Sequence, residues 1–370
     1  MAYTNGNDAF STPITRYYVD IRPHAPVNAT RQLTPLRKEE DKLPLLDTLS
    51  KETQDVITKY VRKPDRFMSL ASALLKYLFI HRTAKIPWSK VKVERTPKPH
   101  SRPYWAPPND WSGKGFEGLE FNVSHQAGMV VLVGCKTPKR TRDARIDYRH
   151  DVSIRSPPVI NPDPTAVLEA DSWIHDDERE DVRIGVDIAC TWEPPRTPDL
   201  STQKQLEEWV DIFEEMFSKK EQDDMKYLPV PSPVPSPADI KDADQKTRRF
   251  YTYWALKEAY IKMVGEGLLA PWLRELEFRD VPIPTRAKVD EPHMWTILPD
   301  EQVNRLGVLF KNRNIAHTMH TSLEAFQDTF LVATMTRGIV DHPESDPRWT
   351  KIDLFGAIQS CATGNCRCLE

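Results

Sequence analysis

The sequence lacks an excess of charge of either sign, a long apolar run and an apolar leader, and each absence excludes a class of protein. Its 51 lysine and arginine residues nearly balance 54 aspartate and glutamate residues. The net charge of −3 argues against nonspecific binding to nucleic acid, which needs a basic surface. No apolar run reaches the roughly 20 residues of a membrane span, and residues 1–20 do not resemble a secretory signal. We therefore expect a cytoplasmic, monomeric protein without nucleic-acid or membrane partners.

Cysteine is also scarce, and its distribution is uneven. Only five of the 370 residues are cysteine, and three of these, Cys361, Cys366 and Cys368, lie close to the C-terminus. An odd number that gathers at one end argues against a disulfide framework and agrees with reduced thiols. Arg367 stands where a prenylation motif would need cysteine. The spacing indicates metal binding by this segment only weakly.

Proline, by contrast, is frequent and divides the chain. It is densest at residues 229–237, which should form an extended loop. A second polar tract, residues 136–182, starts basic and ends acidic, and it contains too few apolar side chains to fold by itself. We therefore expect an N-terminal half at 1–135, a polar insertion at 136–182, a C-terminal half at 183–340 that contains the proline-rich loop, and a C-terminal tail at 341–370.

The N-terminal half shows one strong helical pattern and one hairpin pattern. Apolar residues recur at helical spacing over residues 66–80, which predicts an amphipathic helix packed on a sheet. Residues 121–125 and 129–134 read as two strands, and the turn between them contains Gly128. This half therefore combines a helix with an antiparallel pair of strands.

The C-terminal half shows a similar alternation of strands and helices. Apolar residues alternate along residues 183–188, which predicts a strand that carries Asp187 on its other face. Ser218 and Glu221 have capping-box spacing for a short helix. Further elements are a helix with apolar residues from Trp209 to Phe217, a helix at 249–264 and strands at 277–278, 293–298 and 329–335. The expected fold class is α+β, with two sheet-and-helix halves.

The segment from Trp254 to Lys262 contains the most informative charges. On a helix, Trp254, Glu258 and Lys262 lie four residues apart and share one face, and Lys257 lies beside them. This face would present one carboxylate and two ammonium groups. Taken alone, the segment is more typical of a solvated Glu258–Lys262 pair beside a buried tryptophan.

Asp187 changes the interpretation of this helix, because it supplies a second carboxylate. An isolated aspartate in a strand more often accepts a local hydrogen bond. Together, Asp187 and Glu258 offer a divalent ion two oxygen ligands, and Mg²⁺ usually takes one or two protein carboxylates together with water and phosphate oxygens. Carboxylates beside lysines predict a phosphoryl-type site.

Ser124 and His125 are a candidate phosphate-binding pair at the end of a strand. Both side chains can donate to phosphate oxygens, although a histidine that merely fills a strand end explains the pattern equally well. A Ser-His-Asp hydrolase is excluded, because adjacent residues of a strand point to opposite faces. The sequence contains no Walker loop, which excludes a P-loop enzyme.

Four segments, taken in order, resemble the motifs of the Sfp-type 4'-phosphopantetheinyl transferases, and the sequence looks like a filamentous-fungal member. These segments are Phe121-Asn-Val-Ser-His125, Gly185-Val-Asp-Ile188, Phe217-Ser-Lys-Lys-Glu221 and Trp254-Ala-Leu-Lys-Glu-Ala-Tyr-Ile-Lys262. Each motif is short, but four in the right order are specific, and the resemblance extends from about Arg62 to Met335. It implies a pseudo-twofold arrangement of two similar α+β halves with coenzyme A bound between them.

The resemblance also implies roles for individual residues. Asp187 and Glu258 match the family's magnesium ligands, and Glu258, Lys262 and Asp187 are the implied catalytic residues. Where many bacterial members carry a second acid, this sequence has Ala189, so the number of protein ligands on the metal stays open. Coenzyme A would be bound by Lys63, Arg66, Arg102, Ser124, His125, Lys257 and Lys262.

The implied reaction transfers the 4'-phosphopantetheine arm of coenzyme A to a serine of an apo carrier protein. Glu258 would deprotonate this serine directly or through water held by the ion. The implied partners are carrier domains of polyketide synthases, nonribosomal peptide synthetases and aminoadipate reductase, and Lys219, Lys220 and Lys226 are candidate docking charges, although a solvated surface explains them better. The alternative is a catalytically inactive module that binds coenzyme A or a carrier protein.

Overall fold

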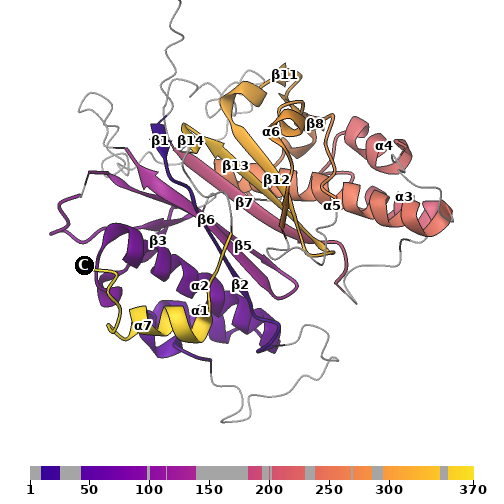
Figure 1. Cartoon of the computed structure of the whole chain (residues 1–370). Coiled ribbons are helices and arrows are strands. Elements are labelled where there is room, and N and C mark those ends of the chain that lie inside the picture. The colour runs from indigo at the N-terminus through magenta and orange to yellow at the C-terminus, as the bar shows by residue number, and fades with distance from the viewer. Residues whose placement is uncertain are drawn as a thin grey trace, which may run out of the picture.

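Two four-stranded sheets form the centre of the computed structural model, one in each half of the chain. Figure 1 shows the two sheets side by side, with helices packed against them. The expected α+β class with two sheet-and-helix halves is confirmed. The structure describes residues 10–25, 43–97, 101–113, 115–138, 182–193, 200, 202–229, 238–267, 270–285, 295–341 and 349–370. Most of the polar insertion and of the proline-rich loop lies outside these residues.

The N-terminal half contains a sheet with the strand order β15-β2-β6-β5, in which β15 (Thr350–Lys351) comes from the end of the chain. Helix α2 buries apolar residues on several faces because it lies between this sheet and other segments. The helix begins next to Pro64 and ends where Lys85 adopts a left-handed conformation. The elements of this half are β2 (Thr15–Asp20), η1 (Leu46–Thr48), α1 (Lys51–Thr58), α2 (Lys63–Ala84), η2 (Trp88–Lys90), β3 (Val93–Arg95), β4 (Pro103–Trp105), β5 (Gly118–Gln126) and β6 (Met129–Thr137).

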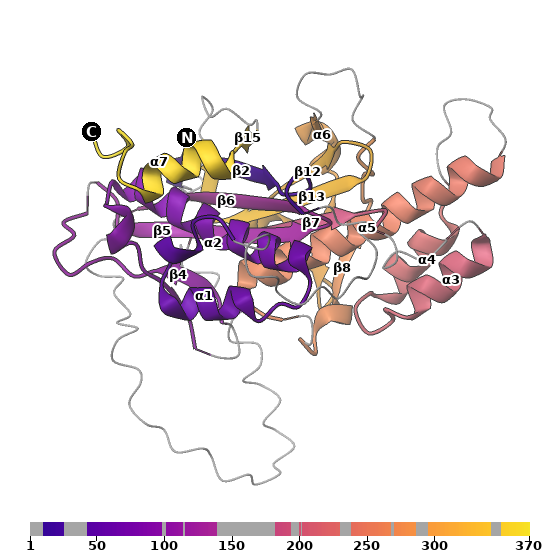
Figure 2. The same cartoon turned by 90° about the horizontal axis from the view of Figure 1, so that it is seen from below.

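The C-terminal half contains a sheet with the order β7-β13-β12-β9 and a smaller sheet with the order β11-β10-β8. Helix α5 packs along β7, and α3 and α4 lie beside its N-terminal part (Figure 2). The elements are β7 (Arg183–Cys190), α3 (Gln203–Asp211), α4 (Lys219–Tyr227), α5 (Ala238–Val264), η6 (Leu273–Glu275), β8 (Leu276–Arg279), β9 (Trp295–Ile297), α6 (Asp300–Val303), β10 (Gly307–Phe310), β11 (Arg313–Asn314), η7 (Ala316–Thr318), β12 (His320–Phe326) and β13 (Phe330–Arg337).

One predicted helix is shorter than its apolar pattern suggested. Helix α3 ends at Asp211, and Ile212, which lies within the apolar pattern from Trp209 to Phe217, is exposed. The chain turns after Asp211, and this turn lets Phe213 and Phe217 pack against Phe250 of α5. The apolar residues from Trp209 to Phe217 are therefore spaced as in one helix, although the later ones are buried from a turn that follows the helix.

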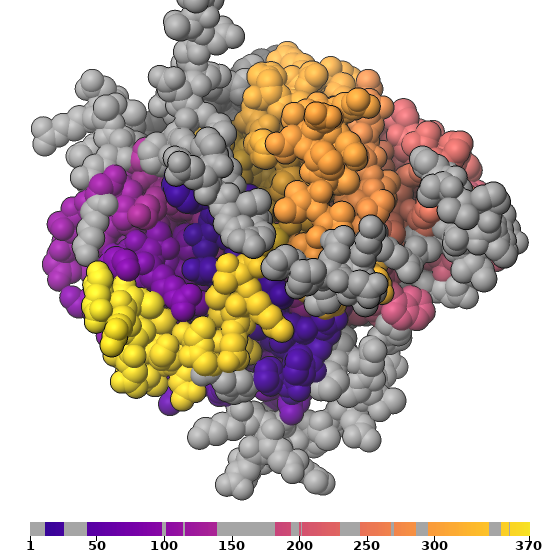
Figure 3. Space-filling view, viewed as in Figure 1, coloured from indigo at the N-terminus to yellow at the C-terminus, as the bar shows by residue number. Residues whose placement is uncertain are grey.

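The last residues of the chain return to the N-terminal half, which their description as a tail did not foresee. Strand β14 (Ile339–Asp341) pairs in parallel with β1 (Phe10–Thr12), and β15 (Thr350–Lys351) pairs in parallel with β2. The π-helical turn η8 (Leu354–Ile358) and α7 (Gln359–Ala362) follow and add apolar side chains to the core around α2. In Figure 3 this yellow segment covers part of the purple half.

Polar side chains of β5 join the two large sheets. Three acceptors at alternate positions of β5 receive hydrogen bonds from backbone amides of β7: Glu120 from Ile184 (3.4 Å), Asn122 from Val186 (3.4 Å) and Gln126 from Cys190 (3.0 Å). Because β7 is an edge strand of its sheet, these side chains satisfy amide groups that would otherwise lack partners. The junction also places Ser124, which lies on the same face of β5, beside β7.

Gly185 permits the close approach of α5 to β7. A Cβ atom at this position would lie 2.0 Å from the carbonyl oxygen of Ala259 and 2.5 Å from the amide nitrogen of Met263. Both atoms belong to the backbone of α5, so no side-chain rotation can relieve the contact. Asp187 shares this face of β7, so α5 comes near it as well.

We expect Gly185→Ala to lower the free energy of unfolding by about 2–3 kcal/mol, because the helix must move away from the strand. The same displacement should separate Asp187 from the side chains of α5 and reduce activity in the protein that remains folded. Urea unfolding measures the first effect. Gly267→Ala is the matched control, because a Cβ there meets no atom within 4 Å and should change stability by less than about 0.5 kcal/mol. Equal stability of the two variants would contradict the argument.

Candidate active site

Asp187 lies where β5, β7 and α5 meet. Its side chain extends from β7 toward α5, on which Glu258 and Lys262 lie one helical turn apart and point to the same side. Ser124 approaches from β5. Asp187 is buried, whereas the side chain of Lys262 retains 26% of its exposure. The strand, the helix and the hairpin thus bring together four side chains that the sequence had singled out.

Three of these side chains form a closed hydrogen-bonded cluster. Lys262 Nζ lies 2.6 Å from Asp187 Oδ1 and donates to Ser124 Oγ at 2.8 Å. Ser124 Oγ donates in turn to the same Asp187 oxygen at 2.7 Å. The bonds are short, and Lys262 and Asp187 are charged, so they hold both side chains firmly in place.

Glu258 lies beside this cluster without joining it. Neither of its carboxylate oxygens has a hydrogen-bond partner among the described residues. Burial raises the pKa of Glu258 to about 7, and repulsion from Asp187 adds to the shift, while Lys262 partly offsets it. A carboxylate with a pKa near neutrality is well suited to accept a proton.

The donor atoms at this site fit a hard divalent cation. Asp187 directs Oδ1 to Lys262 and Ser124, and its second oxygen has no hydrogen-bond partner in the part of the chain that the structure describes. The Glu258 carboxylate is equally free, and it is close enough to Asp187 for the two charges to repel. Two neighbouring oxygen donors without partners form the kind of site that Mg²⁺ takes in combination with phosphate oxygens.

Ala189 supplies no further ligand. It shares the face of Asp187 but is fully buried in the apolar core of the C-terminal half. No third carboxylate therefore stands at this position. A glutamate there would have to enter this core, so the structure does not provide the space that a longer side chain would need.

His125 points away from Ser124, as expected for adjacent residues of a strand. It is accessible to solvent, yet protein atoms surround much of it. This loss of hydration lowers its pKa to about 4, and repulsion from Lys262 and Lys76 contributes. His125 is thus neutral at physiological pH, and Lys262 and Lys76 lie near enough to repel its protonated form.

Lys76 is a candidate that the sequence reading missed. It interrupts the apolar stretch of α2, and burial lowers its pKa to about 8, with repulsion from Arg95 as a smaller cause. A single lysine within a long apolar helical run is a signal that could have identified it. Lys76, Lys262 and His125 together favour an anionic ligand in this region.

Arg102 lies near the end of α5 that carries Lys262. Its aliphatic chain contacts Gly265, which closes α5 with a φ of +88°. Its Nη2 atom forms an ion pair with Glu120, whereas its Nη1 atom is buried without a hydrogen-bond partner among the described residues. A buried guanidinium donor with no protein acceptor is available for a phosphate group.

Lys63 and Arg66 lie in the first turn of α2, where the helix dipole favours anions. Arg66 is buried, and Lys63 lies over the ring of Phe67. The next turn contacts the β5–β6 hairpin, because Met68 Sδ accepts a hydrogen bond from the amide of Gly128 at 3.3 Å. These two cations therefore lie at the hairpin end that also carries His125.

Lys257 does not enter the site, which corrects the expectation that it binds phosphate. Its side chain is fully buried, pairs with Glu221 at 2.9 Å and donates to the carbonyl oxygens of Leu273 and Leu276. Neighbouring residues of a helix point about 100° apart, so Lys257 faces α4 and β8 while Glu258 faces β7. Its role in this structure is to link elements within the C-terminal half.

The lysines considered for docking are mostly engaged within the protein. Lys226 is buried and forms an ion pair with Asp211, so it is not a surface charge. Lys219 and Lys220 form ion pairs with Asp223 and Asp224 one turn along α4. The structure thus favours a solvated helix face, except at Lys226.

Two family profiles match consecutive parts of the chain. Residues 35–137 match the N-terminal domain of 4'-phosphopantetheinyl transferases, and residues 183–303 match the 4'-phosphopantetheinyl transferase superfamily. The second match contains Asp187, Glu258 and Lys262. In the described part of the chain, no helix has the length and apolar character needed to cross a membrane.

Several characterised proteins are similar to this chain. A 4'-phosphopantetheinyl transferase A of Aspergillus fumigatus is 38% identical over 96% of both chains, and a 4'-phosphopantetheinyl transferase of Emericella nidulans is 35% identical over 98% of both. A human L-aminoadipate-semialdehyde dehydrogenase-phosphopantetheinyl transferase is 24% identical over 62% of this chain and 52% of its own length. The likeness to the two fungal proteins thus extends over nearly the whole sequence.

Proposed function

Because the chain belongs to the 4'-phosphopantetheinyl transferase superfamily, we propose that Asp187, Glu258 and Lys262 form its reaction centre. The chain is an enzyme that transfers the 4'-phosphopantetheine arm of coenzyme A to a serine of an apo carrier protein. The products are the holo carrier and adenosine 3',5'-bisphosphate. The observation that carries the proposed site is the pair of neighbouring carboxylates with free oxygens beside the ammonium group of Lys262.

Each residue of the centre has a distinct part in the proposed mechanism. Glu258, whose carboxylate has no hydrogen-bond partner among the described residues, accepts the proton of the carrier serine. Lys262 neutralises charge on the pyrophosphate of coenzyme A, and Ser124 and Asp187 hold Lys262 in position. The serine oxygen attacks the phosphorus that bears the pantetheine arm, and the bond to the nucleotide phosphate breaks. Mg²⁺ held by Asp187 and Glu258 would supply further positive charge at the pyrophosphate.

Cationic side chains around the centre are proposed to bind the rest of coenzyme A. The free Nη1 donor of Arg102 and the neutral ring of His125 can both donate to phosphate oxygens. Lys63 and Arg66 at the start of α2 suit the ribose phosphate, and Lys76 joins this set. Isothermal titration of coenzyme A into single alanine variants tests each assignment.

The proposed carrier partners include the domains of polyketide synthases, nonribosomal peptide synthetases and aminoadipate reductase. Names of animal relatives refer to the dehydrogenase of aminoadipate semialdehyde, which supports the last of these. The decisive experiment incubates the protein with an apo carrier domain, coenzyme A and Mg²⁺, and measures the mass gain of the carrier. An inactive binding module would retain affinity for coenzyme A but leave the carrier mass unchanged.

We expect Mg²⁺ to bind weakly to the free enzyme and more tightly when coenzyme A is present. Only two protein carboxylates are available, since Ala189 offers none, and the phosphates would supply the remaining charge. Titration of Mg²⁺ into the enzyme with and without coenzyme A measures this coupling, and dephospho-coenzyme A, which keeps the pyrophosphate, is the control. Equal affinity in the presence and absence of coenzyme A would contradict the proposed ligand set.

We expect Lys262→Ala to lower kcat/KM by about 30- to 1,000-fold, which corresponds to about 2–4 kcal/mol of lost charge stabilisation. The loss should exceed any loss of stability, because a quarter of the side chain is already exposed. Lys246→Ala is the matched control, because Lys246 lies on the same helix about 24 Å along its axis from Lys262. Equal kinetics of Lys262→Ala and the wild type would remove Lys262 from the reaction centre.

A further inference from the structure

Four potential metal ligands gather where the end of the chain contacts α2. They are His81, from the last turn of that helix, and Cys361, Cys366 and Cys368. Their ligand atoms all lie within 4.8 Å of one another. His81 Nε2 is 3.1 Å from Cys366 Sγ, and Cys361 Sγ is 3.7 Å from Cys368 Sγ. The four side chains come from segments that are 280 or more residues apart, so folding alone brings them together.

These distances agree with a tetrahedral site. Zinc–sulfur bonds of about 2.3 Å place two sulfur ligands about 3.8 Å apart, and a nitrogen ligand slightly closer to each sulfur. The observed sulfur–sulfur separation of 3.7 Å already has this value. Since no two of the four ligand atoms are more than 4.8 Å apart, they need to approach one another by at most about 1 Å.

The surroundings orient the histidine for metal binding. Its Nδ1 atom lies 2.6 Å from the carbonyl oxygen of Ile86, which can only accept a hydrogen bond. The proton therefore resides on Nδ1, and the lone pair of Nε2 accepts from the Cys366 thiol, a position that a metal ion can take once the thiol loses its proton. A backbone carbonyl that fixes the second ring nitrogen is the usual support of a metal-bound histidine.

Nearby cations also match the charge that such a site would have. Three thiolates and one Zn²⁺ ion sum to one negative charge. Lys85 Nζ donates to the carbonyl oxygen of Cys368 at 2.6 Å, and the guanidinium of Arg82 lies near the side chain of Cys361. These two cations remain beside the ligands in the fold.

We propose that His81, Cys361, Cys366 and Cys368 bind one structural Zn²⁺ ion. A closed set of four protein ligands, three sulfurs and one nitrogen, is typical of structural zinc, whereas a catalytic site would keep one position for water. The ion joins the end of the chain to α2 and reinforces the pairing of β15 with β2. His81 lies about 22 Å along α2 from Arg66, so the ion would sit at the opposite end of this helix from the cations of its first turn.

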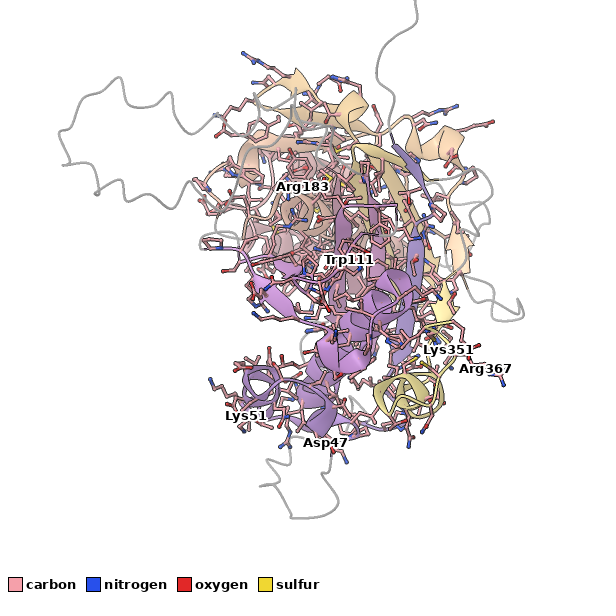
Figure 4. The ribbon with its side chains drawn as sticks, turned by 90° about the vertical axis from the view of Figure 1, so that its left-hand side faces the viewer. Asp47, Lys51, Trp111, Arg183, Lys351 and Arg367 are labelled. Atoms are coloured by element: carbon pink, nitrogen blue, oxygen red, sulfur yellow. The ribbon has the colours of Figure 1, made fainter. Side chains whose placement is uncertain are left out.

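In Figure 4 the C-terminal segment with Lys351 and Arg367 lies beside α2, on the side away from Arg183 of β7. Arg367, between two of the ligands, points outward and is exposed, as expected if its neighbours turn inward toward an ion. The zinc therefore acts on the fold of the N-terminal half and does not take part in transfer.

The test measures the metal content of the full chain, purified without an affinity tag or chelator from zinc-supplemented cells. Inductively coupled plasma mass spectrometry should find one zinc per chain in the wild type. The control Cys135→Ala should also keep one zinc, because Cys135 is buried in β6 away from the cluster. Cys366→Ser and Cys368→Ser should lose the zinc. Cys368→His should keep it, because a nitrogen ligand replaces the sulfur.

Cobalt provides a second readout that does not depend on variants. Co²⁺ added to the reduced wild-type protein should produce the thiolate-to-metal charge-transfer band and the intense visible bands of tetrahedral cobalt, and Zn²⁺ should abolish them. Three outcomes would overturn the proposal: wild-type protein without zinc or a cobalt spectrum, serine variants that retain the metal, or a Cys361–Cys368 disulfide in protein isolated under nonoxidising conditions. The cobalt result decides the matter if a serine variant fails to fold.

Discussion

Glu258→Gln is expected to lower the rate of transfer by about 1,000-fold, equivalent to about 4 kcal/mol in the barrier. The amide has nearly the shape of the carboxylate but cannot accept the serine proton or ligate Mg²⁺ as an anion. Single-turnover measurements with saturating coenzyme A and apo carrier separate this loss from changes in binding. Glu208→Gln, at an exposed position of α3, is the matched control and should retain full activity. Near-normal turnover by Glu258→Gln would exclude Glu258 as the base.

The same variant should not weaken the fold of the metal-free protein. Because burial raises the pKa of Glu258 from 4.5 to about 7, the folded state binds its proton more tightly than the unfolded state. The wild type should therefore lose stability as the pH rises from about 4.5 to 7, by at most about 3 kcal/mol. Glutamine removes this dependence, so the variant should be the more stable protein at pH 8. Urea unfolding of both proteins at several pH values measures the difference.

Lys257 precedes Glu258 in the sequence, but Lys257→Ala should affect stability rather than the transfer step. We expect it to destabilise the protein by about 3–5 kcal/mol. Its removal leaves the carboxylate of Glu221 buried without its cation, and it frees two carbonyl oxygens that Lys257 now satisfies. Glu221 also accepts hydrogen bonds from the amides of Ser218 and Phe278, so it cannot turn toward water without breaking the start of α4. Urea unfolding measures the loss.

A second substitution distinguishes a lost ion pair from lost packing. Lys257→Met keeps most of the side-chain volume but leaves the charge of Glu221 unpaired. The double variant Lys257→Met/Glu221→Gln also removes that charge, so it should be more stable than Lys257→Met alone. Lys204→Ala is the control, because its pair with Glu208 is exposed and contributes little. Affinity for coenzyme A should not change in the folded fraction of any of these variants. If Lys257→Met bound coenzyme A much more weakly than the wild type, Lys257 would have to be a coenzyme A-binding residue.

These two neighbours show what the sequence could and could not predict. The four-residue spacing of Glu258 and Lys262 on a helix and the alternation around Asp187 on a strand are local patterns, so both elements and the shared face were predictable. The direction of Lys257 depends on Glu221, which is distant in sequence and meets it only through the packing of α4 and β8. The spacing of residues along one helix therefore cannot predict which way Lys257 points.

The same reasoning explains the other differences. The helix that contains Lys76 was predicted, but whether a lysine in an apolar run reaches the site depends on how α2 lies on the sheet. The pairing of β15 with β2 joins segments more than 300 residues apart, and each is short and without a distinctive alternation. The ladder between β5 and β7 likewise needs both sheets in place before its acceptors meet their amides.

The return of the last residues to the first half has a consequence for biosynthesis. The ribosome releases β2 and β6 early, but β15 follows Thr137, the end of β6, only after more than 200 further residues. At about 5–20 residues per second, the nascent N-terminal half would wait roughly 10–40 s with its sheet unfinished. The strands from β7 to β13 meanwhile emerge as a nearly complete set. Translation that stops before residue 349 would therefore leave the half that was made first, rather than the half that was made last, without its final strand.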